Sequence, residues 1–258
     1  TNIETLRFAD GSEVTLSVAS GEEFLVNTYT SSDQSGSSVT ALADGGYVVA
    51  WQDSSGHDGG SSWDIRAQLY DMVNNPVGEE FRVNTYTSSS QVDPSITATS
   101  DGGFVVTWRD DSGHSGGSSY DIRGQRFDSD GSTMGAEFLV NAQYTSGYQY
   151  SPSVAELDGG DLMVAWYDDG QGDDIYAQRV NTDGSLDGDR FRVNTYTNNV
   201  QSEPDITATS DGGFVVTWQS RYQDYSSTYG VYGQRYHADG TTNGSEFHVN
   251  TQYTSGHQ

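Results

Sequence analysis

The sequence predicts an all-β fold, a β-propeller built from four-stranded antiparallel blades. Three observations predict this fold: a repeat of about 56 residues, a two-residue apolar period within the strands, and a tryptophan at the same position of each repeat. No apolar pattern of helical period reaches a useful length, so we expect little helix.

The repeat is marked by the tetrapeptide Phe-x-Val-Asn, which occurs five times. Its copies follow one another at intervals of 57, 57, 53 and 56 residues, starting at Phe24, Phe81, Phe138, Phe191 and Phe247. One tryptophan keeps the same spacing, and we expect it in the structural core of each blade: Trp51, Trp108, Trp166 and Trp218. The predicted organisation is a single repeat domain, 1–258, with a partial blade (second half) at 1–23, repeats at 24–80, 81–137, 138–190 and 191–246, and the start of a further repeat at 247–258.

Each repeat predicts four short strands, and the second repeat shows them in order. Alternation over 94–99 places Ile96 and Ala98 on one face, and the Asp-Gly pair that follows is typical of a tight hairpin. The second strand, 104–108, places Phe104, Val106 and Trp108 on one face. A long polar loop leads to the third strand at 122–127, and a turn at 128–131 leads to the fourth at 138–141.

Two other all-β architectures compete with the propeller. A tandem of β-sandwiches is disfavoured because a sandwich domain needs about 100 residues. A calcium-binding β-roll is disfavoured because its glycine-rich nonapeptide is approximated only once, at 116–121, without a tandem array.

The N-terminal half-unit would need two inner strands to complete its sheet. About half a further unit at the C-terminus would give five equal blades. Two explanations stay open: this chain is part of a longer repeat array, or another copy completes the blade by strand exchange and so builds a fibre.

The composition excludes several classes of function. The net charge is −26, from 37 carboxylates and 11 basic residues, all of them arginine. Such a surface repels nucleic acid, and no apolar run reaches the ~20 residues that membrane insertion requires. The absence of cysteine excludes disulfides and thiolate metal sites.

The repeat unit at 101–141, with Asp-Gly-Gly-Phe-Val-Val-Thr-Trp at its start and Glu-Phe-Leu-Val-Asn at its end, resembles repeats of very large secreted bacterial proteins. These are the RTX-type and cadherin-like surface adhesins. The resemblance implies a secreted, extracellular location at the bacterial cell surface or matrix, a calcium-rich setting, and no catalytic residue.

The long loop after each tryptophan is acidic and rich in glycine, which suits calcium because calcium binds carboxylate and carbonyl oxygens. The candidate calcium ligands are Asp53, Asp58, Asp64, Asp110, Asp111, Asp121, Asp168, Asp169, Asp173 and Asp174. The alternative is that these aspartates cap turns in solvated loops. A transition-metal site is disfavoured because His57 and His114 are isolated within their loops.

The fourth loop replaces acidic residues with Tyr222, Tyr225 and Tyr229. Tyrosines beside polar groups suit sugar rings and protein contacts alike, and they also pack onto their own blade. Glutamine and tyrosine recur at equivalent positions of the repeats, which favours a structural task for both residue types. The recurring residues are Tyr29, Tyr86, Tyr196, Gln34, Gln91, Gln149 and Gln201.

The motifs of a nucleophile elbow, a phosphate loop and a zinc protease do not occur. The sequence therefore predicts a protein that is not an enzyme: a structural or adhesive module whose partners are a cell-surface glycan or other copies of itself, with calcium as its cofactor. The first alternative is a lectin that uses the three loop tyrosines. The remote alternative is a glycosidase near the propeller axis.

Overall fold

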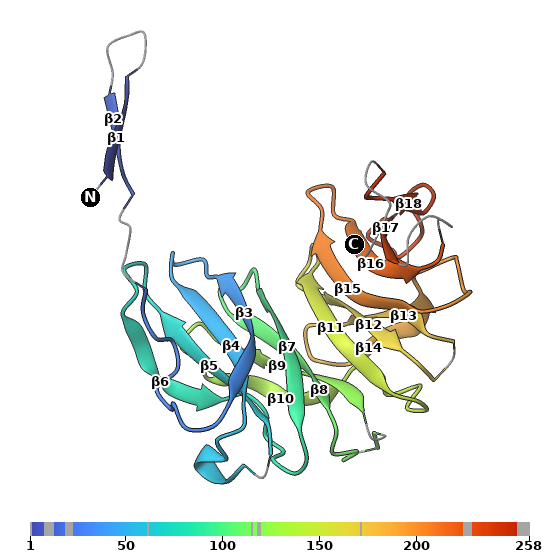
Figure 1. The fold of residues 1–258 in the computed structure, drawn as a ribbon, viewed down its shortest axis with the longest axis horizontal. Helices are drawn as coiled ribbons and strands as arrows, with labels where there is room; N and C mark the ends of the chain where they lie inside the picture. The colour runs from blue at the N-terminus through green and yellow to red at the C-terminus, as the bar shows by residue number, and fades with distance from the viewer. Residues whose placement is uncertain are drawn as a thin grey trace.

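The computed structural model describes residues 2–7, 13–18, 23–60, 62–114, 116–117, 120–170, 172–223 and 229–251, the first two ranges by backbone alone. These residues form an all-β structure in which four four-stranded antiparallel sheets pack like propeller blades, so the predicted fold class is confirmed. Figure 1 shows the four sheets following one another in chain order around an arc. Within the described ranges, no helix has the length and apolar character needed to cross a lipid bilayer.

Each blade takes its four strands from consecutive parts of the chain. Blade 1 contains β3 (Gln34–Ala41), β4 (Tyr47–Asp53), β5 (Asp64–Tyr70) and β6 (Pro76–Arg82). Blade 2 contains β7 (Gln91–Ala98), β8 (Phe104–Asp110), β9 (Asp121–Phe127) and β10 (Thr133–Leu139). Blade 3 contains β11 (Gln149–Glu156), β12 (Leu162–Asp168), β13 (Asp174–Val180) and β14 (Leu186–Arg192). Blade 4 contains β15 (Gln201–Ala208), β16 (Phe214–Arg221), β17 (Tyr229–Tyr236) and β18 (Phe247–His248).

Three elements of the described residues lie outside the four-stranded sheets. The strands β1 (Asn2–Arg7) and β2 (Glu13–Val18) pair with each other in a separate two-stranded antiparallel sheet. A short 3-10 helix, η1 (His57–Gly59), interrupts the loop between β4 and β5.

The Asp-Gly-Gly sequence forms the turn between the first two strands, as the sequence predicts. In blade 2 the Asp101 carboxylate accepts hydrogen bonds from the Thr99 hydroxyl and the Gly103 backbone N–H. Gly102 has a φ of 96°, which disfavours any residue with a side chain. A Cβ at Gly103 would lie 2.2 Å from the Phe127 carbonyl oxygen, so this position requires glycine for a different reason, close backbone approach.

The hydrophobic core consists of the layers between neighbouring blades. Separate clusters of buried side chains join blades 1 and 2, blades 2 and 3, and blades 3 and 4. The recurring tryptophans are buried in these layers or on the corresponding face of blade 1, with exposed fractions of 3% or less: Trp51, Trp108, Trp166 and Trp218. Because each sheet buries both faces, its middle strands are apolar on both sides.

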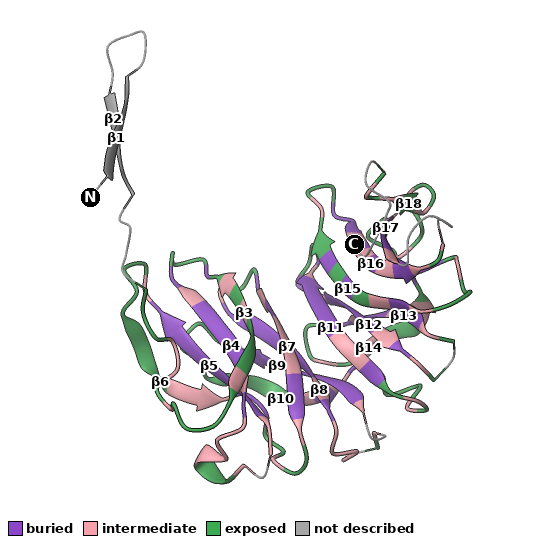
Figure 2. Ribbon diagram, in the orientation of Figure 1, coloured by how far each residue is buried: buried purple, intermediate pink, exposed green. Residues whose placement is uncertain are grey.

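Burial falls from the middle strands of a blade to its outermost strand. All seven residues of β9 are buried, whereas the first four residues of β10 are exposed. Figure 2 shows the same contrast in blade 1, where β5 is buried and much of β6 is exposed. The third strand of these blades is therefore part of the core, and the first half of the outermost strand faces solvent.

Candidate functional site

The innermost strands of the four blades surround a cavity of about 410 Å³. The fifth residue of each of these strands lines it: Ser38, Ser95, Ser153 and Asp205. Three blades thus place a small serine at this level, and the fourth places a carboxylate. The Asp205 carboxylate accepts a hydrogen bond of 3.1 Å from the Ser153 hydroxyl, and this bond joins the innermost strands of blades 3 and 4.

A β-bulge recurs two residues earlier in every innermost strand. The bulge residue has a positive φ in each blade: Gly36 (62°), Asp93 (56°), Ser151 (48°) and Glu203 (51°). The pairing with the second strand shifts register at this point in all four blades. Bulges of this kind re-aim side chains, and left-handed backbone at a residue other than glycine costs of order 1–3 kcal/mol.

Carboxylates occupy the third and fifth positions of these strands without following the repeat. Asp93 and Glu203 hold the third position in blades 2 and 4, and Asp205 holds the fifth position in blade 4. Asp93 Oδ2 lies 3.1 Å from a guanidinium nitrogen of Arg109, whereas Glu203 and Asp205 are exposed. Asp205 lines the cavity, and Asp93 and Glu203 lie two residues before the lining residues Ser95 and Asp205 of their strands. Carboxylates are the groups that general acid–base chemistry requires.

These three carboxylates were missed by the sequence analysis, which selected aspartates by their abundance in the long loops. The available signal was the departure from the repeat. The glutamine that begins each innermost strand is invariant across the four blades, while the second residue after it is glycine, aspartate, serine or glutamate in turn. A position that varies inside an otherwise regular repeat is released from the structural task that its neighbours share.

Glu156 also lines the cavity, at the far end of β11. Its carboxylate accepts hydrogen bonds of 2.7 Å from the Ser100 backbone N–H and 3.2 Å from the Ser100 hydroxyl. Because these bonds tie blade 3 to the β7–β8 turn of blade 2, we assign Glu156 a structural role.

Six of the predicted calcium ligands are buried at the ends of the second and third strands. They face one another as cross-strand pairs, Asp53 with Asp64, Asp110 with Asp121, and Asp168 with Asp174. The first member of each pair accepts a hydrogen bond from the backbone N–H two residues later. The second accepts one from the asparagine of the Phe-x-Val-Asn motif, namely Asn84, Asn141 or Asn194. These six aspartates therefore close hairpins and do not lie in solvated loops.

The other four predicted ligands also have protein partners. Asp58 pairs with Arg66 at 3.3 Å, Asp111 with Arg109 at 3.0 Å, Asp169 accepts the Tyr148 backbone N–H, and Asp173 accepts the Tyr167 hydroxyl. Burial raises the pKa of Asp111 above its ordinary range, against the opposing effect of the Arg109 charge.

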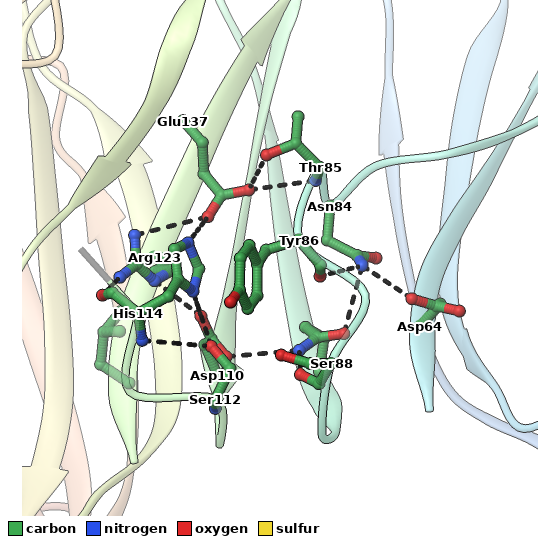
Figure 3. A network of polar contacts seen from close by, with 12 residues as sticks. Asp64, Asn84, Thr85, Tyr86, Ser88, Asp110, Ser112, His114, Arg123 and Glu137 are labelled. Atoms are coloured by element: carbon green, nitrogen blue, oxygen red, sulfur yellow. Dashed lines mark hydrogen bonds and ion pairs between the residues drawn. The ribbon is translucent and has the colours of Figure 1, made fainter. Parts of the chain in front are cut away.

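One group of side chains among the described residues brings three metal-ligand atoms within 4.8 Å of one another: Asp110, His114 and Glu137. The His114 Nδ1 lies 3.1 Å from Asp110 Oδ2, and its Nε2 lies 3.3 Å from Glu137 Oε1 (Figure 3). His114 is therefore not isolated, contrary to the expectation from the sequence, because folding brings β8, its loop and β10 together.

The donor set of this triad fits a metal ion, with one competing contact. A nitrogen and two carboxylates suit Zn²⁺ better than Ca²⁺, which takes six to eight oxygens. Arg123 already contacts both carboxylates, at 2.6 Å from Asp110 Oδ2 and 3.4 Å from Glu137 Oε1 (Figure 3). The triad could hold a metal, and the ion would share its carboxylates with a guanidinium.

Tyrosines that follow the Phe-x-Val-Asn motif stack on a histidine ring or an arginine guanidinium of the next blade. Tyr29 stacks on His57 with ring centroids 3.4 Å apart, and Tyr86 stacks on His114 at 3.9 Å. In blade 3 the corresponding Tyr144 lies over the guanidinium of Arg190, 4.1 Å from the ring centroid. The repeat thus uses tyrosine to cover a polar network.

Of the three tyrosines predicted to bind sugar, the structure describes Tyr222 and Tyr229, and their sugar binding stays a prediction. Tyr222 is 42% exposed, and the Arg221 guanidinium lies 4.9 Å from its ring centroid. Tyr229 begins β17 and pairs in register with Arg221, while Tyr225 lies outside the described residues.

A different set of tyrosines gathers where blades 2 and 3 meet. We call Tyr120, Tyr148, Tyr150 and Tyr167 the tyrosine cluster; the centroids of neighbouring rings lie 4.6 to 6.3 Å apart. The Arg109 guanidinium lies 4.8 Å from the Tyr120 ring centroid and 5.4 Å from that of Tyr150. Arg109 therefore links this cluster to Asp93.

No family model matches the sequence, and no curated protein matches it. Solved structures do match the fold. The chain is similar to an alpha-L-arabinofuranosidase from Podospora anserina in complex with cellotriose, with a TM-score of 0.53 and 10% identity over 86% of this chain and 69% of that one. It is also similar to a thermostable family-43 glycoside hydrolase (TM-score 0.49, 14% identity, 80% and 73% of the two chains) and to an endo-arabinanase from Bacillus licheniformis (0.47, 14%, 84% and 80%).

These comparisons correct three expectations from the sequence. The resemblance to RTX-type and cadherin-like adhesins, the non-enzymatic adhesive function and the absence of enzyme activity are all contradicted by the finding that this chain shares its fold with an alpha-L-arabinofuranosidase. The physical reason is that the Asp-Gly-Gly-Phe-Val-Val-Thr-Trp pattern specifies a hairpin and its packing. Such a pattern identifies a blade, and a blade serves many functions.

Proposed function

We propose that this protein is a glycoside hydrolase that acts on a neutral glycan at the mouth of the axial cavity. One observation carries the proposal: the innermost strands hold Asp93, Glu203 and Asp205 at positions where the residue type differs between blades. The fold shared with an arabinofuranosidase supports the same conclusion without determining the reaction.

Hydrolysis of a glycosidic bond requires a proton donor and a second carboxylate that acts as base or nucleophile. We assign Asp93 and Glu203 to these two tasks because both stand at equivalent bulges, in blades 2 and 4, two residues before a residue that lines the cavity. Arg109 fixes the position of the Asp93 carboxylate through an ion pair. Asp205, two residues beyond Glu203 and lining the cavity, would bind sugar hydroxyl groups.

The net charge of −26 favours an uncharged glycan, since a uronic acid would be repelled from a mouth lined by carboxylates. We further propose that the protein acts outside the cell, because a polymeric glycan does not cross a membrane. A metal ion at the Asp110, His114 and Glu137 triad would stabilise blade 2, and we propose calcium there only as an alternative to zinc, which suits the donors better.

The proposal is tested by incubating the protein with linear arabinan, xyloglucan and cellotriose and measuring the release of reducing sugar. We expect hydrolysis of at least one glycan, and a loss of about 100-fold or more in kcat for Asp93→Asn and for Glu203→Gln. The dependence of kcat/KM on pH in each variant distinguishes the two roles. Loss of the fall at high pH identifies the residue that acts as the acid, and loss of the fall at low pH identifies the base.

The matched control is Glu79→Gln, which neutralises an exposed carboxylate on β6, away from the innermost strands. Its activity should equal that of the unaltered protein. Absence of hydrolysis of all three glycans by the folded protein, or full activity of Asp93→Asn and Glu203→Gln, would overturn the proposal.

A further inference from the structure

We propose that the tyrosine cluster is a binding platform for a second sugar residue, so that the ligand is a neutral oligosaccharide and not a single sugar. This inference rests on the proposed function, whose substrate it specifies.

The tyrosine cluster is a departure from the repeat. The residues at the positions of Tyr148, Tyr150 and Tyr167 in blade 2 are Ser90, Val92 and Arg109. In blade 1 they are Asp33, Ser35 and Gln52, and in blade 4 they are Val200, Ser202 and Gln219. Stabilising a blade therefore does not require tyrosine at these positions, and the junction of blades 2 and 3 is where tyrosines accumulate.

The cluster offers an exposed ring on a rigid base. Tyr148 is 45% exposed, while the rings of Tyr120 and Tyr150 lie beneath or beside it at centroid distances of 4.6 and 6.3 Å. Its backbone N–H donates a 2.7 Å hydrogen bond to Asp169, which fixes the chain at this residue. An aromatic ring held in this way presents an apolar face at little cost in conformational entropy, and a sugar ring stacks on such a face.

Polar groups suited to sugar hydroxyls surround the rings. Asp169 and Asp173 lie at one side, where Asp173 accepts the Tyr167 hydroxyl at 2.6 Å. Arg109 lies against the Tyr120 and Tyr150 rings and pairs with Asp93 and Asp111 at 3.1 and 3.0 Å. The carboxylates accept hydrogen bonds from hydroxyl groups and repel acidic sugars, so the geometry points to an uncharged ligand.

The platform and the axial mouth are adjacent. Tyr150 precedes Ser153, which lines the cavity, by three residues of β11, a span of about 10 Å along an extended strand. Arg109 contacts both Tyr150 and Asp93. A chain of sugars that places one bond at Asp93 thus brings a neighbouring sugar to the tyrosine cluster.

The test is affinity electrophoresis in gels that contain xyloglucan or linear arabinan, which reports binding without requiring hydrolysis. We expect the unaltered protein to be retarded by at least one of the two. Tyr148→Ala should bind about tenfold more weakly, because it removes the ring on which the sugar stacks. Tyr148→Phe, which keeps the ring, should bind nearly as well as the unaltered protein.

The control is Tyr86→Ala, since Tyr86 is 44% exposed and belongs to the recurring set that covers a polar network. Retardation equal to that of the unaltered protein is expected. No retardation of the unaltered protein in either gel, or equal retardation of Tyr148→Ala, overturns the inference even if hydrolysis is observed. A third outcome separates the two proposals. If Tyr148→Ala loses retardation while the unaltered protein and Tyr86→Ala keep it, and no glycan is hydrolysed, the platform is supported and the proposed hydrolase is refuted.

Discussion

Blades 2 and 3 share strand order and register but supply their buried ion pair from different strands. In blade 2, Arg123 of β9 contacts Asp110 and Glu137. In blade 3, Tyr176 occupies the position of Arg123. Arg190 of β14 occupies the position that Glu137 has on β10, and Arg190 pairs with Asp168. A tyrosine covers the network in both blades. Blades 2 and 3 therefore both pair the aspartate at the end of the second strand with an arginine, but the arginine comes from a different strand in each blade.

The largest expected effect comes from removing the cation of blade 2. Arg123→Met leaves Asp110 and Glu137 buried without their counter-ion, so we expect a loss of about 3–5 kcal/mol in the free energy of unfolding. Urea unfolding measures it. Arg192→Met is the control, because the Arg192 side chain is 46% exposed and its ion pair at 3.6 Å should contribute less than about 1 kcal/mol. Equal effects of the two substitutions would refute the comparison.

Rebuilding blade 2 in the manner of blade 3 should recover part of this loss. The double variant Arg123→Tyr, Glu137→Arg moves the cation from β9 to β10, and we expect it to be about 2 kcal/mol more stable than Arg123→Met. A double variant no more stable than the single one would show that the two arrangements are not interchangeable.

A smaller effect is expected for the tyrosine cover. Tyr86→Leu and Tyr144→Leu each remove an aromatic ring from a cationic or imidazole partner, and each should lower the free energy of unfolding by about 1 kcal/mol. The effect of Tyr144→Leu should not depend on pH between 5 and 8, because its partner is an arginine. A pH-dependent cost there would contradict the assigned contact.

The smallest expected effect is on how the free energy of unfolding depends on pH, where Asp174 and Asp130 should act in opposite directions. Burial raises the pKa of Asp174 above 3.8, although Asn194 opposes the shift, so the folded state retains this proton to higher pH than the unfolded chain. Its contribution to stability is complete below pH 3.8 and is lost as pH rises. Hydrogen bonds from Ser132 lower the pKa of Asp130, whose contribution is instead lost as pH falls below 3.8.

Urea unfolding of Asp174→Asn and Asp130→Asn between pH 3 and 6 checks both signs. The stability of Asp174→Asn relative to the unaltered protein should improve as pH rises, and that of Asp130→Asn should improve as pH falls. The same direction in both variants would show that these shifts do not govern the dependence.

The sequence predicts the fold well because blade formation is a local property repeated many times. Alternation in Phe104–Trp108 and the glycines at 102 and 103 act within a few residues of the chain. The site was not predicted, because its members come together only when blades stack. Asp93 meets Arg109 within one blade, but Arg109 meets Tyr150 across a blade boundary.

Six of the ten predicted calcium ligands lie buried at strand ends and not in open loops, and the sequence analysis missed this for a related reason. Calcium binding by these residues stays a prediction. The residue type alone does not distinguish a solvated calcium ligand from a buried hairpin residue. Asp64 looks like any acidic loop residue in the sequence, yet Asn84, 20 residues later, accounts for its burial by donating a 2.7 Å hydrogen bond. The recurrence of that asparagine in every repeat was the usable signal.

The most direct test of the account is a crystal structure of Glu203→Gln with cellotriose. We predict a sugar residue at the mouth of the axial cavity within hydrogen-bonding distance of Asp93, and a neighbouring sugar stacked on Tyr148. A glycan bound elsewhere, with the innermost strands and the tyrosine cluster left unoccupied, would contradict the account.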